Sequence, residues 1–250
     1  MKLVVSFCFI VLAAPLLAKA PAVNDIINRA RATVGTEEAL DGLVTLSVIG
    51  QVNPADPKLP ETTVLLVARK PNSQRLEVRM DDMVETTITH GTSGCVIRSN
   101  IKEDVSQMRP LSQVEFDRIR HSTKQLFSYY RPDYKNGEKV RYAGITQRRG
   151  IRCHKLVYAY PQSDDRTVRF FSVNDDTLVS TIKHSNGKRV EVVDIGRQMI
   201  GGIRFPERQE YFEGEKKLHT FKFRMVEANR SLKAGLFDVP VAPKPSAGAN

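Results

Sequence analysis

The chain has 250 residues, of which 41% are hydrophobic and 26% are charged. This length fits one globular domain with a hydrophobic core, or at most two small ones. The formal net charge of +10 at pH 7 favours anionic partners, which include phospholipid head groups, acidic polymers, nucleic acid and acidic proteins, without choosing among them.

The N-terminus has the pattern of a secretory signal peptide. Lys2 is followed by an apolar run over residues 3–17 and then by small residues. Cleavage after residue 22 rather than after residue 20 keeps Pro21 away from the cut, so we expect a signal peptide over residues 1–22 and a mature chain from Val23. An uncleaved anchor is the alternative, although the run is too short to span a bilayer comfortably. Export predicts a periplasmic protein and makes nucleic acid an unfavourable partner, and Cys8 lacks the surroundings of a lipid-attachment cysteine.

Two cysteines, Cys95 and Cys153, remain in the mature chain, where the compartment is oxidising. A disulfide between them would close a loop of 58 residues, 153 minus 95. Such a loop stabilises by about 4 kcal/mol in the chain-entropy model. Two buried free thiols on different strands are the alternative. No cysteine or histidine spacing is typical of a metal site, so none is predicted.

The first half of the mature chain changes from helical to strand periodicity. Helices are predicted over residues 24–34, where Asn24 or Asp25 can cap an apolar stripe, and over residues 36–40. Alternating apolar and polar residues then predict strands over 44–52, 62–69, 75–81, 84–89 and 95–98.

A third helix and a second series of strands follow. Pro110 interrupts the strand pattern, and a capping box of Ser112 and Glu115 predicts a helix to about Tyr130, closed by Pro132. Its buried stripe is expected at Phe116, Ile119, Leu126 and Tyr130. Further strands are predicted over 140–147, 151–160, 167–173, 178–184, 189–195, 203–212 and 219–226, with turn residues between them. About a dozen strands with short connections predict an antiparallel meander, and the helical pieces suffice to cover one concave face. The tail over residues 241–250 is predicted to be disordered.

The stretch HGTSGC, from His90 to Cys95, holds three residue types that nucleophilic enzymes use. A serine hydrolase elbow needs G-x-S-x-G between a strand and a helix, whereas Cys95 stands where the second glycine is required, two residues after Ser93. Apolar alternation on both sides, with Gly91 and Gly94 in between, instead predicts a hairpin turn. No phosphate-binding glycine loop is present either. We therefore predict no catalytic residue, no cofactor and no enzyme activity.

Several stretches, taken in order, resemble one protein family. The first is RATVGTEEAL, which leads into the strand that ends at Gly50. The second is GIRCHKL, from Gly150, followed by residues 168–173 and by NDDTLV. The last are GIRFP, from Gly202, then Gly214, VEAN, Leu232 and the ending FDVP. Together they are similar to the first helix and strand, the middle hairpins, the G-x-x-x-P strand and the F-x-x-P ending of the LolA/LolB-like outer-membrane lipoprotein-sorting family.

The resemblance implies a mainly β fold over residues 23–240. The expected architecture is a strongly curved antiparallel sheet, an unclosed half-barrel with a few helices plugging its concave face. The resemblance also implies an apolar cavity for the acyl chains of lipoproteins or for other apolar ligands, or a periplasmic sensor of the RseB/MucB type.

Seven apolar residues on the alternating strands are expected to line either the core or this cavity. They are Leu46, Val48, Leu76, Val78, Met80, Phe221 and Phe223. Our leading hypothesis is a monomeric periplasmic carrier or binding protein for a lipid or lipidated protein, with an inner- or outer-membrane protein as a further partner. The alternative is a protein-interaction or envelope-stress sensor module of the same fold.

Overall fold

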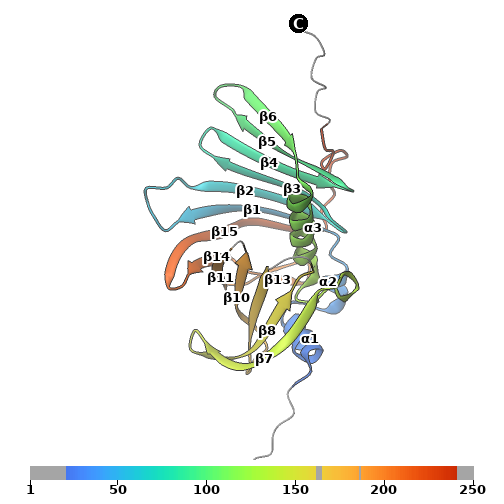
Figure 1. Ribbon diagram of the computed structural model, residues 1–250, viewed down its shortest axis with the longest axis vertical. Helices are drawn as coiled ribbons and strands as arrows, with labels where there is room; N and C mark the ends of the chain where they lie inside the picture. Colours follow the sequence, from blue (N-terminus) through green and yellow to red (C-terminus); the bar gives the residue numbers. More distant parts are fainter. Residues whose placement is uncertain (1–20, 162–164, 186, 241–250) are drawn as a thin grey trace, which may run out of the picture.

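The computed structural model describes residues 21–161, 165–185 and 187–240 (Figure 1). The expected signal peptide lies outside the described residues except for its last two positions, and the expected tail, residues 241–250, lies outside them entirely. Within the described residues no helix is long and apolar enough to cross a membrane.

Thirteen strands form one antiparallel sheet in the order β6-β5-β4-β3-β2-β1-β15-β14-β11-β10-β9-β8-β7, and β12 and β13 form a separate hairpin. The bounds are β1 Thr45–Pro54, β2 Thr62–Arg69, β3 Ser73–Met80, β4 Met83–His90, β5 Ser93–Asn100, β6 Val105–Pro110, β7 Lys139–Arg148, β8 Ile151–Ala159, β9 Arg166–Ser172, β10 Leu178–Ser185, β11 Lys188–Ile195, β12 Gln198–Ile200, β13 Ile203–Phe205, β14 Arg208–Glu213 and β15 Lys216–Ala228. The sheet curves strongly, and its edge strands β6 and β7 lie at opposite ends (Figure 1). The predicted fold class, a mainly β half-barrel with helices on its concave face, is confirmed.

Two meanders meet at the pair β1–β15. The strands β1 to β6 each pair with their neighbour in sequence, and so do β7 to β11. The link between the two series is β1, which pairs with β2 on one side and with the last strand, β15, on the other. This register, with Leu46 opposite Ala228, brings the two ends of the domain side by side at the centre of the sheet.

The helices lie on one face of the sheet, which we call the concave face (Figure 1). They are α1 Val23–Val34, α2 Glu37–Asp41, α3 Gln113–Ser128 and the short 3₁₀ helix η1 Tyr134–Asn136. The side chain of Thr36 caps α2, and the capping box predicted for Ser112 and Glu115 begins α3. All three predicted α-helices are therefore confirmed to within two residues at each end.

Two hydrophobic clusters fix the helices to the concave face. The first joins α1 to β8 and β9 and contains Ile26, Ile27, Ala30, Leu156, Tyr158 and Phe171. The second joins α2 and α3 to β1, β2, β13 and β15 and contains Leu40, Leu43, Leu46, Val48, Ala68, Phe127, Ile203, Phe205 and Val226. The helices thus cover only parts of the curved sheet.

The sequence prediction missed two strands, β6 and the three-residue β12, and misplaced two details. β6 was not predicted, because its side chains are almost all exposed and lack an apolar phase; Pro110 stands at its end on the sheet edge, where proline is tolerated. The strand expected over 203–212 is divided at Pro206 into β13 and β14. In α3 the buried residues are Phe116, Thr123 and Phe127, so the stripe is rotated from the predicted one.

The disulfide expected as one alternative is not formed. Cys95 and Cys153 are both free and buried, on β5 and β8. Nine strands separate β5 from β8 in the sheet, which is incompatible with the Cα separation below about 7 Å that a disulfide needs. The other alternative, two buried thiols on different strands, describes the structure.

Candidate functional site

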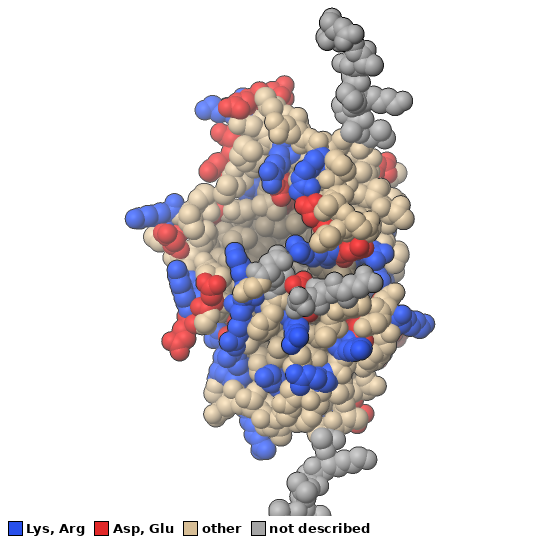
Figure 2. Space-filling model, in the orientation of Figure 1, with Lys and Arg blue, Asp and Glu red and all other residues tan. Residues whose placement is uncertain are grey.

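The concave face and α3 enclose a hollow, which is seen from its open side in Figure 2. The visible wall is uncharged, whereas charged side chains gather around the rim (Figure 2). Where α2 and α3 contact the sheet, the concave face is sealed by the second hydrophobic cluster. Farther along the strands the apolar side chains stay partly exposed; these are Val52, Val64, Val78, Phe221 and Phe223.

The register places all seven apolar residues singled out in the sequence on the concave face. Leu46 and Val48 are 4% and 5% exposed and belong to the closed core beneath the helices. Leu76, Val78, Phe221 and Phe223 are partly buried, so solvent reaches them from the hollow. Met80 is 43% exposed and stands at the β3–β4 hairpin, on the rim.

A glycine gives the hollow part of its depth. Gly50 lies at a bulge in β1 opposite Phe223. A Cβ atom at Gly50 would stand only 2.1 Å from Cζ of Phe221, so the Phe221 ring lies directly over the glycine backbone. Phe223 holds that ring from the side, with the two ring centroids 4.8 Å apart in an edge-on arrangement. The absence of a side chain at Gly50 therefore keeps Phe221 flat against the sheet instead of inside the hollow.

The apolar wall continues without a break into a polar region of the concave face. In one row across the strands Val52 pairs with Phe221, Phe221 with Gln209 and Gln209 with Asp194. The next two rows along the strands place further polar groups on the same face; they are Tyr211, His219, Arg169, Lys183 and Tyr158. We call Arg169, Lys183, Asp194 and Tyr211 the polar end of the hollow.

The contacts within the polar end are ordered. Gln209 Nε2 donates to Asp194 Oδ1 at 2.9 Å, and the Tyr211 hydroxyl donates to Gln209 Oε1 at 3.0 Å. The guanidinium of Arg169 lies 4.3 Å from the ring centroid of Tyr158 and 5.4 Å from that of Tyr130, which is cation–π geometry.

Surrounding protein shifts the pKa values of these groups. Burial raises the pKa of the Asp194 carboxyl, and burial together with the charge of Arg169 lowers the pKa of the Lys183 ammonium. Burial and the Asp194 charge raise the pKa of Tyr211 to about 12. Solvent nevertheless reaches the side chains of Asp194 and Lys183. Groups that solvent can reach while protein surrounds them are expected at the wall of a hollow rather than on an outer surface.

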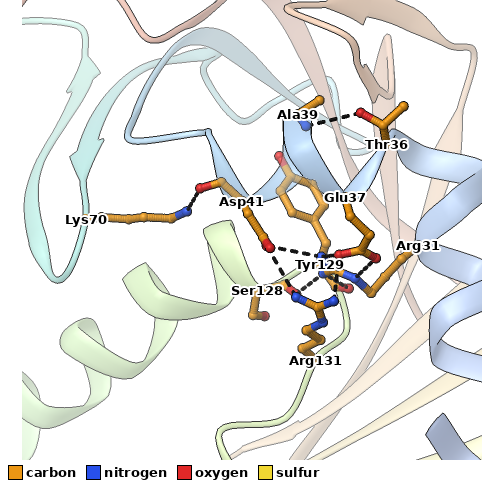
Figure 3. A network of polar contacts seen from close by, with 9 residues as sticks. All are labelled: Arg31, Thr36, Glu37, Ala39, Asp41, Lys70, Ser128, Tyr129 and Arg131. Atoms are coloured by element: carbon orange, nitrogen blue, oxygen red, sulfur yellow. Dashed lines mark hydrogen bonds and ion pairs between the residues drawn. The ribbon is translucent and has the colours of Figure 1, made fainter.

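A buried arginine fixes the helices that border the hollow (Figure 3). The side chain of Arg31, on α1, is 1% exposed and forms a two-pronged ion pair with Glu37 of α2, at 2.9 and 2.7 Å. Its Nη1 donates to the carbonyl oxygens of Ser128 and Tyr129 at 2.7 and 3.0 Å. These carbonyls end α3, where helices leave acceptors unpaired, so one guanidinium joins three helices.

Two further cations, the exposed Arg131 and the partly buried Lys70, complete this network (Figure 3). Arg131 Nη2 and Nη1 contact Glu37 and Asp41 at 2.6 and 3.3 Å, and Lys70 Nζ donates to the carbonyl oxygen of Asp41 at 2.9 Å. Lys70 belongs to the turn after β2, so the network also ties α2 to the sheet.

The HGTSGC stretch forms the predicted hairpin between β4 and β5; Gly91 supplies the positive φ of the turn, whereas Gly94, expected to do the same, lies within β5 without a positive φ. His90 Nδ1 is 2.9 Å from the Ser73 hydroxyl oxygen, and the Phe237 ring is stacked on the imidazole. The Cys95 side chain is buried on the convex face, and burial raises the pKa of its thiol. A thiol held protonated in this way is a poor nucleophile.

The described residues also provide a second pocket and no metal centre. A shallow pocket of about 550 Å³ lies at the β7 edge and is lined by Tyr134, Glu138, Lys139, Val140, Arg141, Val157, Ala159 and Arg166. No group of three or more His, Cys, Asp or Glu side chains in the described part of the chain could hold a metal ion.

Sequence reasoning missed the polar end, Gly50 and Arg31. One signal was present: Lys183 and Asp194 occupy the inward phase of β10 and β11, where apolar residues are expected. Charged residues in that phase indicate a wet or ligand-contacting position. Arg31 carried no such signal, because its three partners come together only in the folded chain.

Comparison with known proteins identifies the fold through structure alone. No protein-family model matches the chain, and no curated protein is similar to it in sequence. Three solved structures match this chain over nearly the whole of their own length. A DUF1329-family protein from Desulfovibrio piger has a TM-score of 0.58 at 11% identity over 86% of this chain and 97% of its own. A LolA-superfamily protein from Nitrosomonas europaea has a TM-score of 0.56 at 12% identity over 87% and 98%. A putative outer membrane lipoprotein-sorting protein domain from Vibrio parahaemolyticus has a TM-score of 0.54 at 7% identity over 86% and 95%.

At such low identity these likenesses speak for the arrangement of strands and helices and not for shared residues. They agree with the unclosed curved sheet, the helices on its concave face and the resemblance noted in the sequence. The chain therefore has a LolA-like fold.

Proposed function

We propose that the protein is a periplasmic carrier or binding protein that holds an acyl chain of a lipid or lipidated protein in the hollow and performs no reaction on it. One observation carries this proposal. The apolar concave face is left partly exposed along β1, β2, β3 and β15, in a hollow bordered by α3, although the same face is fully buried a few residues away (Figure 2).

The energetics favour such a guest. Burying hydrocarbon stabilises by about 0.8 kcal/mol per methylene group, so about ten methylenes contribute about 8 kcal/mol before the costs of association. Binding of this kind needs shape and apolar surface and no catalytic group. It also removes from water the side chains of Val64, Val78 and Phe223, which the helices leave uncovered.

Two further observations agree with this proposal. One solved structure of the same fold is described as a lipoprotein-sorting domain. The signal peptide predicted from the sequence would deliver this chain to the compartment in which such a function operates.

A pair of neighbouring substitutions on β2 tests the proposal. Val64 faces the hollow and Thr63 faces outward on the exposed convex side. We expect Val64→Asp to weaken uptake of a fluorescent long-chain fatty acid at least tenfold, because a carboxylate would have to be desolvated beside the acyl chain. The matched variant Thr63→Asp should bind like the unchanged protein.

Native mass spectrometry of gently purified protein provides the second readout. We expect a mass that includes a lipid or fatty acid, and loss of that added mass in Val64→Asp. An apo mass combined with no uptake of the fluorescent fatty acid would contradict the proposal. Equal uptake by the two variants would place any binding outside the hollow.

A further inference from the structure

We propose that the polar end of the hollow binds the anionic head group of the acyl ligand, a carboxylate or phosphate, through Arg169 and Lys183. This inference rests on the proposed function, because the acyl chain would lie on the apolar wall. It adds the chemical class of the ligand, an anionic amphiphile, to what the fold alone suggests.

The two cations are neighbours with no carboxylate between them. Arg169 pairs with Thr181 and Lys183 pairs with Thr167, so the two side chains are diagonal neighbours on the concave face. Diagonal positions are about 7–8 Å apart, within reach of long side chains. Among the residues that the structure describes, neither cation forms an ion pair: Arg169 lies over the rings of Tyr130 and Tyr158, and Lys183 has no hydrogen-bond partner.

Such an arrangement is unfavourable without an anion. Two like charges in an enclosed space repel each other, and the charge of Arg169 accordingly contributes to the lowered pKa of Lys183. Asp194 is the one carboxylate in the polar end; its charge partly offsets that of Lys183, but it forms an ion pair with neither cation and accepts a hydrogen bond from Gln209. An added carboxylate or phosphate would receive charge-assisted hydrogen bonds from both cations.

The head-group position and the acyl wall are continuous. Four interstrand steps, each about 4.8 Å, lead from β15, which carries Phe221, to β9, which carries Arg169. The distance measured along the curved sheet is thus roughly 19 Å, which an extended long-chain acyl group can span.

The excess of positive charge lies in the half of the chain that contains the polar end. Residues 139–197, which include β7 to β11, contain 12 basic and 6 acidic residues, whereas residues 23–138 contain 15 basic and 16 acidic ones. Lys and Arg dominate the part of the near face that Figure 2 shows over β7–β11 and α1. An anionic ligand would therefore be attracted toward the half of the molecule that holds the polar end.

Three probes with one acyl chain test the inference: a long-chain fatty acid, its methyl ester and the alkyl phosphate. We expect the mature protein to bind the two anionic probes about tenfold more tightly than the ester, as measured by isothermal titration calorimetry. The relative affinity of carboxylate and phosphate identifies which anion the site prefers.

A matched pair of variants locates the effect. Lys183→Met should remove most of the preference for the anion, measured as the ratio of the fatty-acid affinity to the ester affinity of the same variant. Lys222→Met removes the same charge from an exposed convex-face position on β15 and should retain the preference. Equal binding of acid and ester by the unchanged protein would overturn the inference and leave the proposed function intact. Failure to bind any of the three probes would overturn the proposed function itself. A preference that survives in Lys183→Met would place the head group elsewhere.

Discussion

At the scale of single residues, the hollow depends on a position that has no side chain. Gly50 lies beneath the Phe221 ring, and any Cβ there would overlap Cζ of Phe221. Since Phe223 blocks movement along the sheet, an added side chain must push the ring away from the sheet and into the hollow.

We expect Gly50→Ala to lower fatty-acid affinity and to destabilise the fold by about 1–3 kcal/mol through overpacking. Affinity is measured by fluorescence titration and stability by urea unfolding. The double variant Gly50→Ala/Phe221→Leu should regain affinity, because the shorter side chain leaves room above the new methyl group. A Gly50→Ala protein that binds as tightly as the unchanged one would show that Phe221 does not border the ligand.

Residue identities of this kind were only partly predictable. Alternation along β1, β3 and β15 was sufficient to place all seven expected residues on one face. It could not separate the sealed residues, such as Leu46, from the open ones, such as Val78, because that difference depends on where α2 and α3 end. The closeness of Gly50 to Phe221 arises between β1 and β15, which are far apart in sequence, and leaves no mark in either strand alone.

At the scale of elements, the position of the three helices depends on one buried guanidinium. Arg31 holds the carboxylate of Glu37 and two terminal carbonyl groups of α3. Arg131 contacts the same carboxylate but is about half exposed. Arg31 and Arg131 are therefore a buried and an exposed partner of the same carboxylate, and their variants can be compared directly.

We expect Arg31→Met to destabilise the protein by roughly 2–4 kcal/mol, because buried carbonyls and part of a carboxylate lose their donor. Arg131→Met should cost no more than about 1 kcal/mol, as is usual for exposed ion pairs. Urea unfolding of both variants checks this difference. Similar losses in the two variants would refute the assigned role of Arg31.

The elements themselves were predictable wherever a local signal existed. The capping box of Ser112 and Glu115 and the turn glycine Gly91 gave the start of α3 and the β4–β5 hairpin. β6 carries no apolar alternation, since it is an exposed edge strand held by backbone hydrogen bonds to β5. The rotation of the α3 stripe follows from tertiary contacts, in which the Thr123 hydroxyl donates to Gln74 Oε1 at 2.8 Å.

At the scale of the whole molecule, one buried and two partly buried histidines make stability depend on pH. Burial lowers the pKa of His154 and His219, and also that of His121, which faces Glu138. Their folded pKa values lie below the unfolded value of about 6.5, so the unfolded chain binds more protons as the pH falls through this region. These groups therefore destabilise the folded state as the pH is lowered. Asp194, whose pKa is raised, acts in the opposite sense.

We expect a lower melting temperature at about pH 5.5 than at about pH 7.5. The double variant His154→Gln/His219→Gln should show a smaller difference between the two pH values, because two of the three contributions are removed. Differential scanning fluorimetry of both proteins measures it. An equal or steeper pH dependence in the double variant would contradict the assignment.

The account as a whole depends on whether an acyl chain lies on the concave face. A fatty acid that carries a photoreactive diazirine near its tail, crosslinked to the mature protein and mapped by peptide mass spectrometry, tests this directly. We predict crosslinks on the partly exposed wall, at Val64, Val78, Phe221 or Phe223. Crosslinks confined to the convex face or to the β7 edge would contradict the account. Crosslinking that an excess of unlabelled fatty acid does not reduce would also contradict it.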